Sequence, residues 1–600
     1  MIRVADYIVK RLQEHGIGHV FMISGGGAMY LNDAFGKMAY ICNHHEQASA
    51  IAAEGYARAS GKPAAINITT GPGGTNTLTG VLGQWTDSVP AIYIAGQVKF
   101  ETTTLSCKNI GLRQLGDQEI NMEDIARPIT KFAATVLDPL NVKYYLDKAF
   151  FIATHGRPGP VWLDIPMNVQ GATVNEKELV EYDSKEDEIV FDEQKITQQV
   201  RQLVNWLMKS ERPVLVAGWG IRISGAIEEF LSLVEKYKIP VLSTFNGFDL
   251  LPTNHPQHIG VIGTIGSRAG NFALQNSDLM LSVGSRNNIR QVSFNWKVFA
   301  RAAKKVVVDI DAAELKKPTL IPNLAICADA KYFLDLLEEE LKAAKLPDWE
   351  EWNAWCRERK KRYPTVLPEN TDDTRGVDMY YFMRTLSEVL PEGSVAVSGD
   401  GSACVGMFQS GAVKKQQRFF WNSGCAAMGY DLPAAIGACF GIGKKDVICL
   451  AGDGSLQLNI QELQTVVHHQ LPIKLFYLNN NGYQSIRQTQ DSYFPGHRVA
   501  CDPESGVSFP NIQKIAQAYG LPVAELTDHK DIAGKIRKIL ATPGPIVCEV
   551  KLKTDYKFSP KLSSLKLPDG RMISKPLEDL YPFLDREEFK SNMIIPPLKE

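Results

Sequence analysis

The stretch AGDGSLQLNIQELQTVVHHQLPIKLFYLNNNGY, residues 451–483, decides the fold class of this chain. The apolar run that ends at its Gly-Asp-Gly predicts a buried strand, 458–470 has helical spacing, and 473–481 predicts a second buried strand. Two parallel strands joined through a helix end at the same edge of their sheet. We therefore expect Asp453 and Asn480 side by side at the carboxyl edge, where open α/β sheets bind ligands.

These two side chains and the glycine backbone beside them supply oxygen ligands. A carboxylate, an amide oxygen and backbone carbonyls suit Mg²⁺, which normally completes its octahedron with water and substrate phosphates. The same residues also occur in ordinary turns rich in Gly and Asn. The choice between a metal site and a plain turn therefore depends on the rest of the chain.

Composition bounds the class of protein. The chain has 600 residues, 44% of them hydrophobic, so three or four domains are expected rather than one core. A net charge of −2 argues against a nucleic-acid or membrane partner. Ten cysteines without CxxC or zinc spacing predict a reduced, cytoplasmic chain without disulfides. The start has the pattern of an amphipathic helix rather than a signal peptide, and no run of 18 apolar residues predicts a membrane span.

Strand-like and helical runs alternate along most of the chain, which predicts an α/β protein with three doubly wound parallel-sheet domains. Charged segments at 174–195 and 346–375 predict linkers, the second carrying a helix. The predicted domains are 1–172, 195–345 and 376–552. Residues 553–600 show little periodicity and several prolines, so we expect an extended tail laid over a surface.

The first domain contains a second candidate site. Glu46 lies between a short apolar strand and an alanine-rich helix. It either complements the helix dipole or, if buried, has a raised pKa and exchanges protons near neutrality. The glycine-rich loop TTGPGGTN, residues 69–76, lets backbone approach a flat ligand closely, but it lacks the lysine of a Walker motif.

Taken together, these segments resemble the thiamine-diphosphate-dependent enzymes, specifically the acetolactate synthase branch, over nearly the whole chain. The resemblance rests on several long motifs in the right order: HHEQASAIAAEGYARASGKP (44–63), GPGGTN (71–76), DSVPAIYIAGQV (87–98), RPGPVWLDIP (157–166), CAAMGYDLPAAIGA (425–438) and the segment that includes Gly-Asp-Gly and Asn-Asn-Asn. It implies a pyrimidine-binding domain with the activating glutamate, a central FAD-type domain, a diphosphate-binding domain and a tail that covers the active site.

The resemblance also assigns the residues that hold the thiamine cofactor. Asp453, Asn480 and the backbone carbonyl of Gly482 are the implied Mg²⁺ ligands, and Met428 is the implied apolar wedge that bends the cofactor. Methionine is otherwise common as core filler. The remaining implied thiamine diphosphate contacts are Pro72 and Asn76 on the pyrimidine side and Gly401, Ser402, Ala403, Gly452, Gly454 and Ser455 in the diphosphate domain.

Catalytic roles follow from the same resemblance. Glu46 is the implied activating acid: it protonates or hydrogen-bonds the aminopyrimidine, whose imino tautomer then takes the proton from the thiazolium carbon. Gly26 would let backbone approach the substrate, and Gln118 matches an active-site glutamine of the family. Five residues of the central domain match the stretches that hold a largely structural FAD, namely Arg286, Arg290, Asp309, Ile310 and Asp329. A purely structural central domain without flavin is the alternative.

The expected activity is decarboxylation of pyruvate to hydroxyethyl-thiamine diphosphate and transfer of the two-carbon unit to a carbonyl acceptor. The expected assembly is a homodimer or tetramer with active sites between subunits. A thiamine- and flavin-dependent pyruvate oxidase is the alternative enzyme. A scaffold that has lost its chemistry is disfavoured because Glu46, Asp453 and Asn480 are all present. A dinucleotide dehydrogenase is disfavoured because no GxGxxG follows a first strand.

One departure from the family concerns the acceptor. Thr489 stands where acetolactate synthases have a tryptophan, Arg487 lies just before it, and Ile289 replaces a family acid next to the retained Arg290. A small polar wall with an added cation predicts an acceptor that is larger or more polar than a 2-keto acid. We therefore consider a nucleotide-activated keto-sugar, which would give a branched sugar, beside a 2-keto acid as in acetolactate synthesis.

Overall fold

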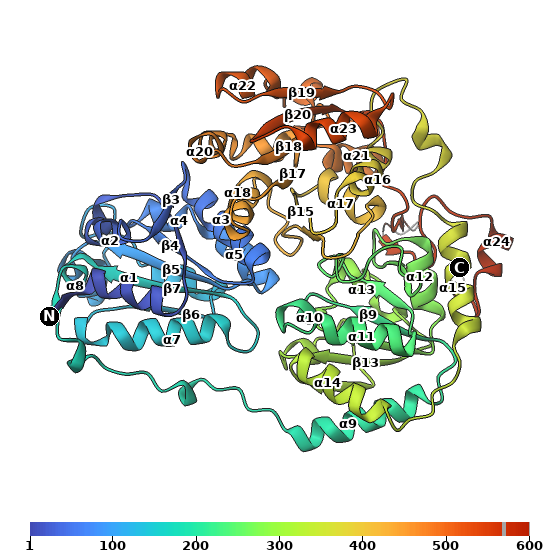
Figure 1. Ribbon diagram of the computed structural model, residues 1–600, viewed down its shortest axis with the longest axis horizontal. Coiled ribbons are helices and arrows are strands. Elements are labelled where there is room, and N and C mark those ends of the chain that lie inside the picture. The colour runs from blue at the N-terminus through green and yellow to red at the C-terminus, as the bar shows by residue number, and fades with distance from the viewer. Residues whose placement is uncertain (567–569, 571, 599–600) are drawn as a thin grey trace.

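Figure 1 shows the computed structural model of the protein, which describes residues 1–566, 570 and 572–598. Three sheets of six parallel strands form three α/β domains, so the predicted fold class is confirmed. The N-terminal domain, in blue, and the central domain, in green, are joined by an extended segment that leads into α9 (Glu193–Leu207). None of the helices in the described part of the chain is long and apolar enough to span a lipid bilayer.

The N-terminal sheet has the strand order β3-β2-β4-β5-β7-β6. Its strands are β2 (His19–Met22), β3 (Ala39–Cys42), β4 (Ala64–Ile68), β5 (Ala91–Gln97), β6 (Phe132–Thr135) and β7 (Pro160–Pro166). The helices around it are α1 (Val4–Glu14), α2 (Met29–Phe35), α3 (Glu46–Ser60), α4 (Pro72–Thr75), α5 (Leu78–Asp87), α6 (Met122–Ala126) and α7 (Val142–Thr154).

The C-terminal sheet repeats this order as β16-β15-β17-β18-β20-β19. Its strands are β15 (Val395–Ser398), β16 (Arg418–Phe420), β17 (Val447–Gly452), β18 (Ile473–Asn479), β19 (Val523–Leu526) and β20 (Ile546–Lys551). Its helices are α16 (Met379–Val389), α17 (Ser402–Ser410), α18 (Asp431–Gly441), α19 (Asp453–Gln457), α20 (Leu463–His469), α21 (Gln484–Tyr493), α22 (Ile512–Ala518) and α23 (Ile532–Ala541).

The central sheet has a different order, β11-β10-β9-β12-β13-β14. Its strands are β9 (Pro213–Ala217), β10 (Val241–Ser243), β11 (His258–Val261), β12 (Leu279–Val283), β13 (Lys304–Asp309) and β14 (Leu324–Cys327), and its helices include α10 (Gly220–Ile223), α11 (Ile227–Tyr237), α12 (Arg268–Asn276), α13 (Ile289–Val292) and α14 (Ala330–Leu341). The order reverses at β9/β12 here, at β2/β4 in the N-terminal sheet and at β15/β17 in the C-terminal sheet. Ligands of open α/β sheets bind at such switch points, so the topology predicts three sites.

The N- and C-terminal domains meet where α3 crosses α18 (Figure 1). Glycines allow the two helix backbones to touch: a Cβ added at Gly437 would lie 1.7 Å from the carbonyl oxygen of Ala52, and one at Gly55 would lie 2.0 Å from that of Ala434. Because the obstacle is backbone on both sides, no side-chain rotation can make room. This crossing fixes the angle between the two domains.

Replacing Gly437 by alanine is expected to lower the free energy of unfolding by about 3 kcal/mol, because the methyl group forces α3 and α18 apart. Urea denaturation of the two proteins measures the difference. Gly443→Ala is the control: its methyl group would meet no atom within 4 Å, and only the left-handed backbone at φ +73° is strained, which costs about 1 kcal/mol. Equal losses for both variants would contradict the close crossing.

The tail lies mostly on the central domain. Residues 553–560 pass the diphosphate domain, where Tyr556 contacts Asn480, but later residues pack on α12 beside α15 (Glu350–Arg362). Leu577 joins the central core, and its carbonyl accepts a hydrogen bond from Asn271. The expected tail over a surface is therefore present, but only its first residues lie at the predicted active site. Apolar burial against the central domain holds the described tail residues near Leu562 and Leu577.

Candidate active site

The adjacency of Asp453 and Asn480 predicted from the sequence is confirmed. Gly452, at the end of β17, lies opposite Leu478 of β18, so the following residues meet at the carboxyl edge. Asp453 Oδ2 accepts hydrogen bonds from the backbone N–H groups of Asn480 (3.1 Å) and Gly482 (3.0 Å). Gly482 has φ +136°, and a Cβ there would lie 2.3 Å from the carbonyl oxygen of Cys501. Only glycine fits this turn.

The electrostatics of Asp453 suit a cation ligand. Burial raises the pKa of this carboxyl to about 6, while its backbone hydrogen bonds and the charge of Arg487 act in the opposite direction. The amide of Asn480 is oriented by two contacts: its Nδ2 donates to the carbonyl of Leu478, and its Oδ1 accepts from the hydroxyl of Tyr556 at 2.6 Å. The amide oxygen is thus held in place by the Tyr556 hydroxyl. A divalent cation fits a buried carboxylate and an oriented amide oxygen of this kind.

Arg487, which was predicted to contact the acceptor, lies against the backbone of the loop that follows β18. Its side chain is buried, and its guanidinium donates to the backbone carbonyls of Thr554, Asn480 and Asn481. The guanidinium therefore stabilises the loop that follows β18. The carbonyl oxygens of Asn480 and Asn481, at the sharp turn before Gly482, thereby gain hydrogen-bond donors.

Thr489, which was predicted to contact the acceptor substrate, lies on the exposed face of α21. Its hydroxyl donates to the carbonyl of Ser485 one turn earlier, at 2.9 Å. The hydroxyl proton is therefore used within α21. The side chain at this position is small, as the sequence indicates, but its hydroxyl has fewer hydrogen bonds to offer a substrate than we expected.

The neighbouring strand end provides the N-terminus of α17. Ser402 and Ala403 form its first turn, and Gly401 precedes it at φ +85°. A Cβ at Gly452 would meet no atom within 4 Å, and one at Gly401 would meet only the Ser485 hydroxyl, so both glycines border open space. Backbone N–H groups at a helix N-terminus beside open space can receive phosphate oxygens.

Met428 reaches the same edge through the segment before α18. The N–H of Gly429 donates to the hydroxyl of Ser455, which follows Gly454 in α19. Met428 itself is 38% exposed in the single chain, so it is not core filler. The predicted residues of the diphosphate domain are therefore brought together around the β15/β17 switch point.

The predicted residues of the N-terminal domain also form one cluster. Glu46 begins α3 after β3, and Asn76, in the turn that follows α4, donates to Glu46 Oε2 at 2.9 Å. Gly26 follows β2, and the next residue, Gly27, donates to the Thr69 hydroxyl at the end of β4. The loop containing Gln118 approaches the same place, because a Cβ at Gly71 would lie 1.9 Å from its carbonyl oxygen. Pro72 is exposed at the start of α4.

Glu46 is only partly buried in the single chain. The apolar enclosure expected from its neighbours in the sequence is therefore absent on one side. The alanines that follow it point into the α3/α18 contact rather than around its carboxyl group. Enclosure of Glu46 requires a ligand or a second subunit.

Two further residues at these sites escaped the sequence analysis. Glu462 is buried, and its carboxylate accepts from Asn43 Nδ2 at 2.9 Å and from the N–H of His44 at 2.8 Å, which ties the Glu46 segment to the diphosphate domain of the same chain. The second is Tyr556, described above. No pattern marked either residue: Glu462 lies in a helical segment that already contains several polar side chains, and Tyr556 lies in the tail.

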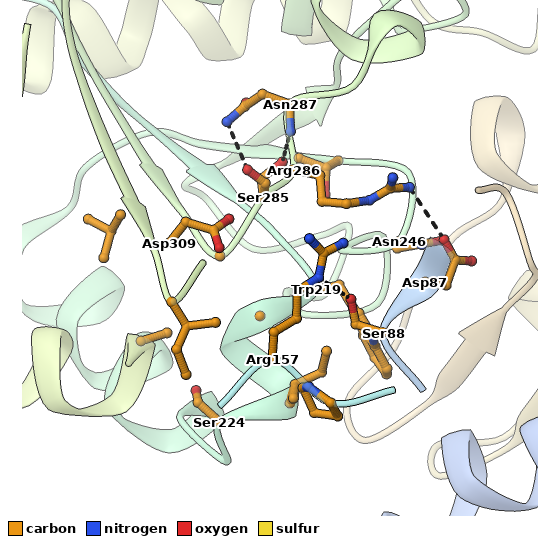
Figure 2. Close-up of a pocket in the computed structure, with 18 of the residues that line it drawn as sticks. Asp87, Ser88, Arg157, Trp219, Ser224, Asn246, Ser285, Arg286, Asn287 and Asp309 are labelled. Atoms are coloured by element: carbon orange, nitrogen blue, oxygen red, sulfur yellow. Dashed lines mark hydrogen bonds and ion pairs between the residues drawn. The ribbon is translucent and has the colours of Figure 1, made fainter. Parts of the chain in front are cut away.

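A cavity of about 360 Å³ occupies the third switch point, at the carboxyl ends of the central strands (Figure 2). All five residues predicted to hold flavin line it: Arg286, Arg290, Asp309, Ile310 and Asp329. Burial raises the pKa of Asp309 to about 6. Asp329 Oδ1 accepts from two backbone N–H groups and caps α14, so part of its hydrogen-bonding capacity is already used.

Other domains contribute to the wall of this cavity. Asp87, Ser88 and Arg157 come from the N-terminal domain, and Ser423 from the C-terminal domain. Arg157 donates to the Ser88 hydroxyl at 2.9 Å and forms ion pairs with Asp311 and Glu314 of the central domain. The sequence did not predict this interdomain lining, because it depends on residues about 150 positions apart.

Three parallel α/β domains with sites at their switch points, two of them with the same strand order, define an α/β enzyme that binds its ligands at domain edges. The chain belongs to the thiamine pyrophosphate enzyme family, of which it matches the N-terminal TPP binding domain over residues 2–123, the central domain over 200–337 and the C-terminal TPP binding domain over 399–550.

Within this family the chain is similar to acetolactate synthases. It is 33% identical to acetolactate synthase 2, chloroplastic, of Nicotiana tabacum over 578 residues, which cover 93% of this chain and 83% of that protein. It is 31% identical to the acetolactate synthase large subunit of Lactococcus lactis subsp. lactis (strain IL1403) over 566 residues, 93% of this chain and 94% of that protein. The protein is thus a thiamine-diphosphate-dependent enzyme of the acetolactate synthase-like branch, as the sequence motifs indicated.

Proposed function

We propose that the protein is a carboligase that decarboxylates pyruvate and transfers the two-carbon unit to a carbonyl acceptor. The observation that carries the proposal is the pair of clusters on the N- and C-terminal domains, one with the Glu46 carboxylate held by Asn76 and one with a buried carboxylate beside open glycines. The similarity to acetolactate synthases supports the same chemistry. When bound, thiamine diphosphate supplies the carbanion and the electron sink that decarboxylation requires.

Different residues of the chain would contact the metal, the diphosphate and the pyrimidine ring of that cofactor. Asp453, Asn480 and the carbonyl of Gly482 would hold Mg²⁺, and the first turn of α17 would receive the diphosphate. Glu46 would hold or release a proton at the pyrimidine ring, with Asn76 keeping its carboxylate in place. Met428 would support the bend of the cofactor, and Gly26 and Gln118 would border the substrate.

A homodimer or tetramer is part of the proposal. Glu46 and Met428 are both partly exposed in the single chain, and so are the apolar side chains of Met29, Leu458 and Ile486. A second copy of the chain would cover these side chains and enclose both clusters. Sedimentation of the purified protein tests this point.

We also propose that the central cavity binds FAD with a structural role. Arg286 and Arg290 offer guanidinium groups for phosphate, and Asp309 lies at a strand end where a ribose or adenine donor is expected. Cavity lining from three domains supports a ligand that stabilises their arrangement. The residues present therefore fit the group.

For the acceptor we favour a 2-keto acid. The case for a nucleotide-activated keto-sugar rested on Arg487, Thr489 and the C-terminal tail. Arg487 donates to backbone carbonyls, the Thr489 hydroxyl donates within its own helix, and much of the described tail packs on the central domain. A small wall whose neighbouring arginine donates to backbone carbonyls favours a compact acceptor over one that carries phosphates. The test below therefore includes a keto-sugar nucleotide as a second acceptor.

The test is an incubation of purified protein with Mg²⁺, thiamine diphosphate, FAD and ¹³C-pyruvate, followed by NMR. Acetolactate is expected as the dominant product, with or without an added 4-keto sugar nucleotide. Label in a branch on the sugar would replace the proposed acceptor, and acetate or acetyl phosphate with reduced flavin would indicate an oxidase. No consumption of pyruvate would contradict the proposed function.

A further inference from the structure

The rim of the central cavity contains an ion pair between two domains. Arg286 follows β12 at the switch point, lines the cavity and keeps 31% of its side chain exposed. Its NH2 group lies 3.6 Å from Oδ1 of Asp87, which ends α5 of the N-terminal domain (Figure 2). The residue that faces the ligand is therefore contacted by a carboxylate from another domain.

The environment of Asp87 leaves one of its oxygens to this contact. The side chain of Asp87 is 0% exposed, and Oδ2 accepts a hydrogen bond from Arg58 NH2 at 2.8 Å. Oδ1 accepts no hydrogen bond from any of the described residues. A buried carboxylate oxygen is stabilised by a nearby cation, and Arg286 supplies one.

The position of Asp87 relative to the cavity is fixed from the other side as well. The neighbouring residue, Ser88, accepts from Arg157, whose guanidinium continues to Asp311 and Glu314 of the central domain. Arg286 of the central domain thus contacts the N-terminal domain, and Arg157 of the N-terminal domain contacts the central domain. Both contacts lie at the cavity. Asp87 can therefore hold Arg286 at a fixed place in the central domain.

We propose that Asp87 is a positioning residue for the ligand of this cavity: it orients Arg286 so that the other N–H groups of the guanidinium receive the diphosphate of a dinucleotide. The inference rests on the proposed FAD site. An arginine held in place before binding loses less side-chain freedom when it meets a phosphate, and its planar fork then matches the phosphate oxygens. The N-terminal domain thereby contributes to the affinity of a site on the central domain.

The experiment is a double-mutant cycle on FAD affinity. Flavin fluorescence measures the dissociation constant of FAD for wild type, Asp87→Asn, Arg286→Gln and the double variant. In Asp87→Asn the amide oxygen can still accept from Arg58, which leaves the amide NH2 group facing Arg286. Each single variant is expected to weaken FAD binding about 10-fold, and the double variant no more than Arg286→Gln alone.

The outcome that overturns the inference is additivity. If Asp87→Asn weakens FAD binding equally in both backgrounds, Asp87 acts on the fold and not through Arg286. Asp249→Asn is the matched control: Asp249 is also fully buried between two arginines, Arg222 and Arg418, at a domain boundary, but it does not line the cavity. This variant is expected to bind FAD within about 2-fold of wild type even if it unfolds at a lower temperature.

Two further results separate the inference from the proposed function. If wild type binds no FAD, the FAD site is wrong and the inference falls with it; if wild type binds FAD and the cycle is additive, only the inference is wrong. If Asp87→Asn does not fold, the FAD affinity of Arg286→Lys tests the inference instead. Its ammonium keeps the charge but cannot contact Asp87 and a phosphate with separate N–H groups, so a loss of about 10-fold is expected. Unchanged affinity would overturn the inference.

Discussion

Replacing Asp453 by asparagine is expected to weaken Mg²⁺-dependent binding of thiamine diphosphate at least about 100-fold, since even residues that only support metal ligands cost 10- to 100-fold. The amide keeps the shape of the carboxylate and one acceptor for the N–H groups of Asn480 and Gly482, but it loses the charge that holds the cation. Titration of the variant with cofactor and Mg²⁺, followed by protein fluorescence, measures the loss.

The same variant has an opposite effect on the protein without cofactor. Burial raises the pKa of Asp453 to about 6, above the ordinary value of 3.8, so the folded state disfavours the ionised form. This contribution to stability is fully present below the unfolded pKa and is lost as the pH rises through about 6. From pH 5 to pH 8 the wild-type apoprotein should therefore lose stability that Asp453→Asn retains, by about 1 kcal/mol, because only about one pKa unit of the shift is titrated in this window.

Thermal unfolding at these two pH values, with and without Mg²⁺ and cofactor, checks both effects. The ligands should raise the midpoint of wild type at pH 8 and leave that of Asp453→Asn nearly unchanged. Asp446→Asn, an exposed change just before β17, is the control and should behave as wild type. Normal cofactor affinity in Asp453→Asn would show that this carboxylate is not a metal ligand.

Replacing Glu46 by glutamine is expected to lower kcat for pyruvate consumption by about 100- to 10,000-fold, the usual range for the loss of a general acid or base. Glutamine can still accept the hydrogen bond from Asn76, so the loop between α4 and α5 should keep its place. The affinity for thiamine diphosphate should change less than about 10-fold, because binding is carried mainly by the diphosphate edge.

Steady-state kinetics and cofactor titration on the same preparation separate the two quantities. Glu101→Gln, an exposed acid in the same domain, serves as the control and should leave both unchanged. Full activity of Glu46→Gln would exclude proton exchange by this residue. A loss of cofactor binding equal to the loss of activity would instead give Glu46 a role in holding the cofactor.

The sequence by itself determined the fold class and the local content of each cluster. Asp453 and Asn480 lie at the ends of two consecutive parallel strands, and this connection leaves few ways to arrange them. Glu46, Gly71 and Gly401 likewise lie within four residues of the end of a strand. The position of a residue that lies just after a strand can be predicted from the sequence. The reason is that strand periodicity and turn residues are local properties of the chain.

Tertiary structure decided which distant residues complete these clusters. Arg487 turns inward to backbone carbonyls, Glu462 ties the Glu46 segment to another domain, and Asp87 holds Arg286 across a boundary. Hydrophobic patterning tells which face of an element is buried but not what it is buried against, and a charged side chain pairs with whatever the packing brings near. The backbone contact at Gly437 sets where the domains meet, and that contact is invisible until α3 and α18 are docked.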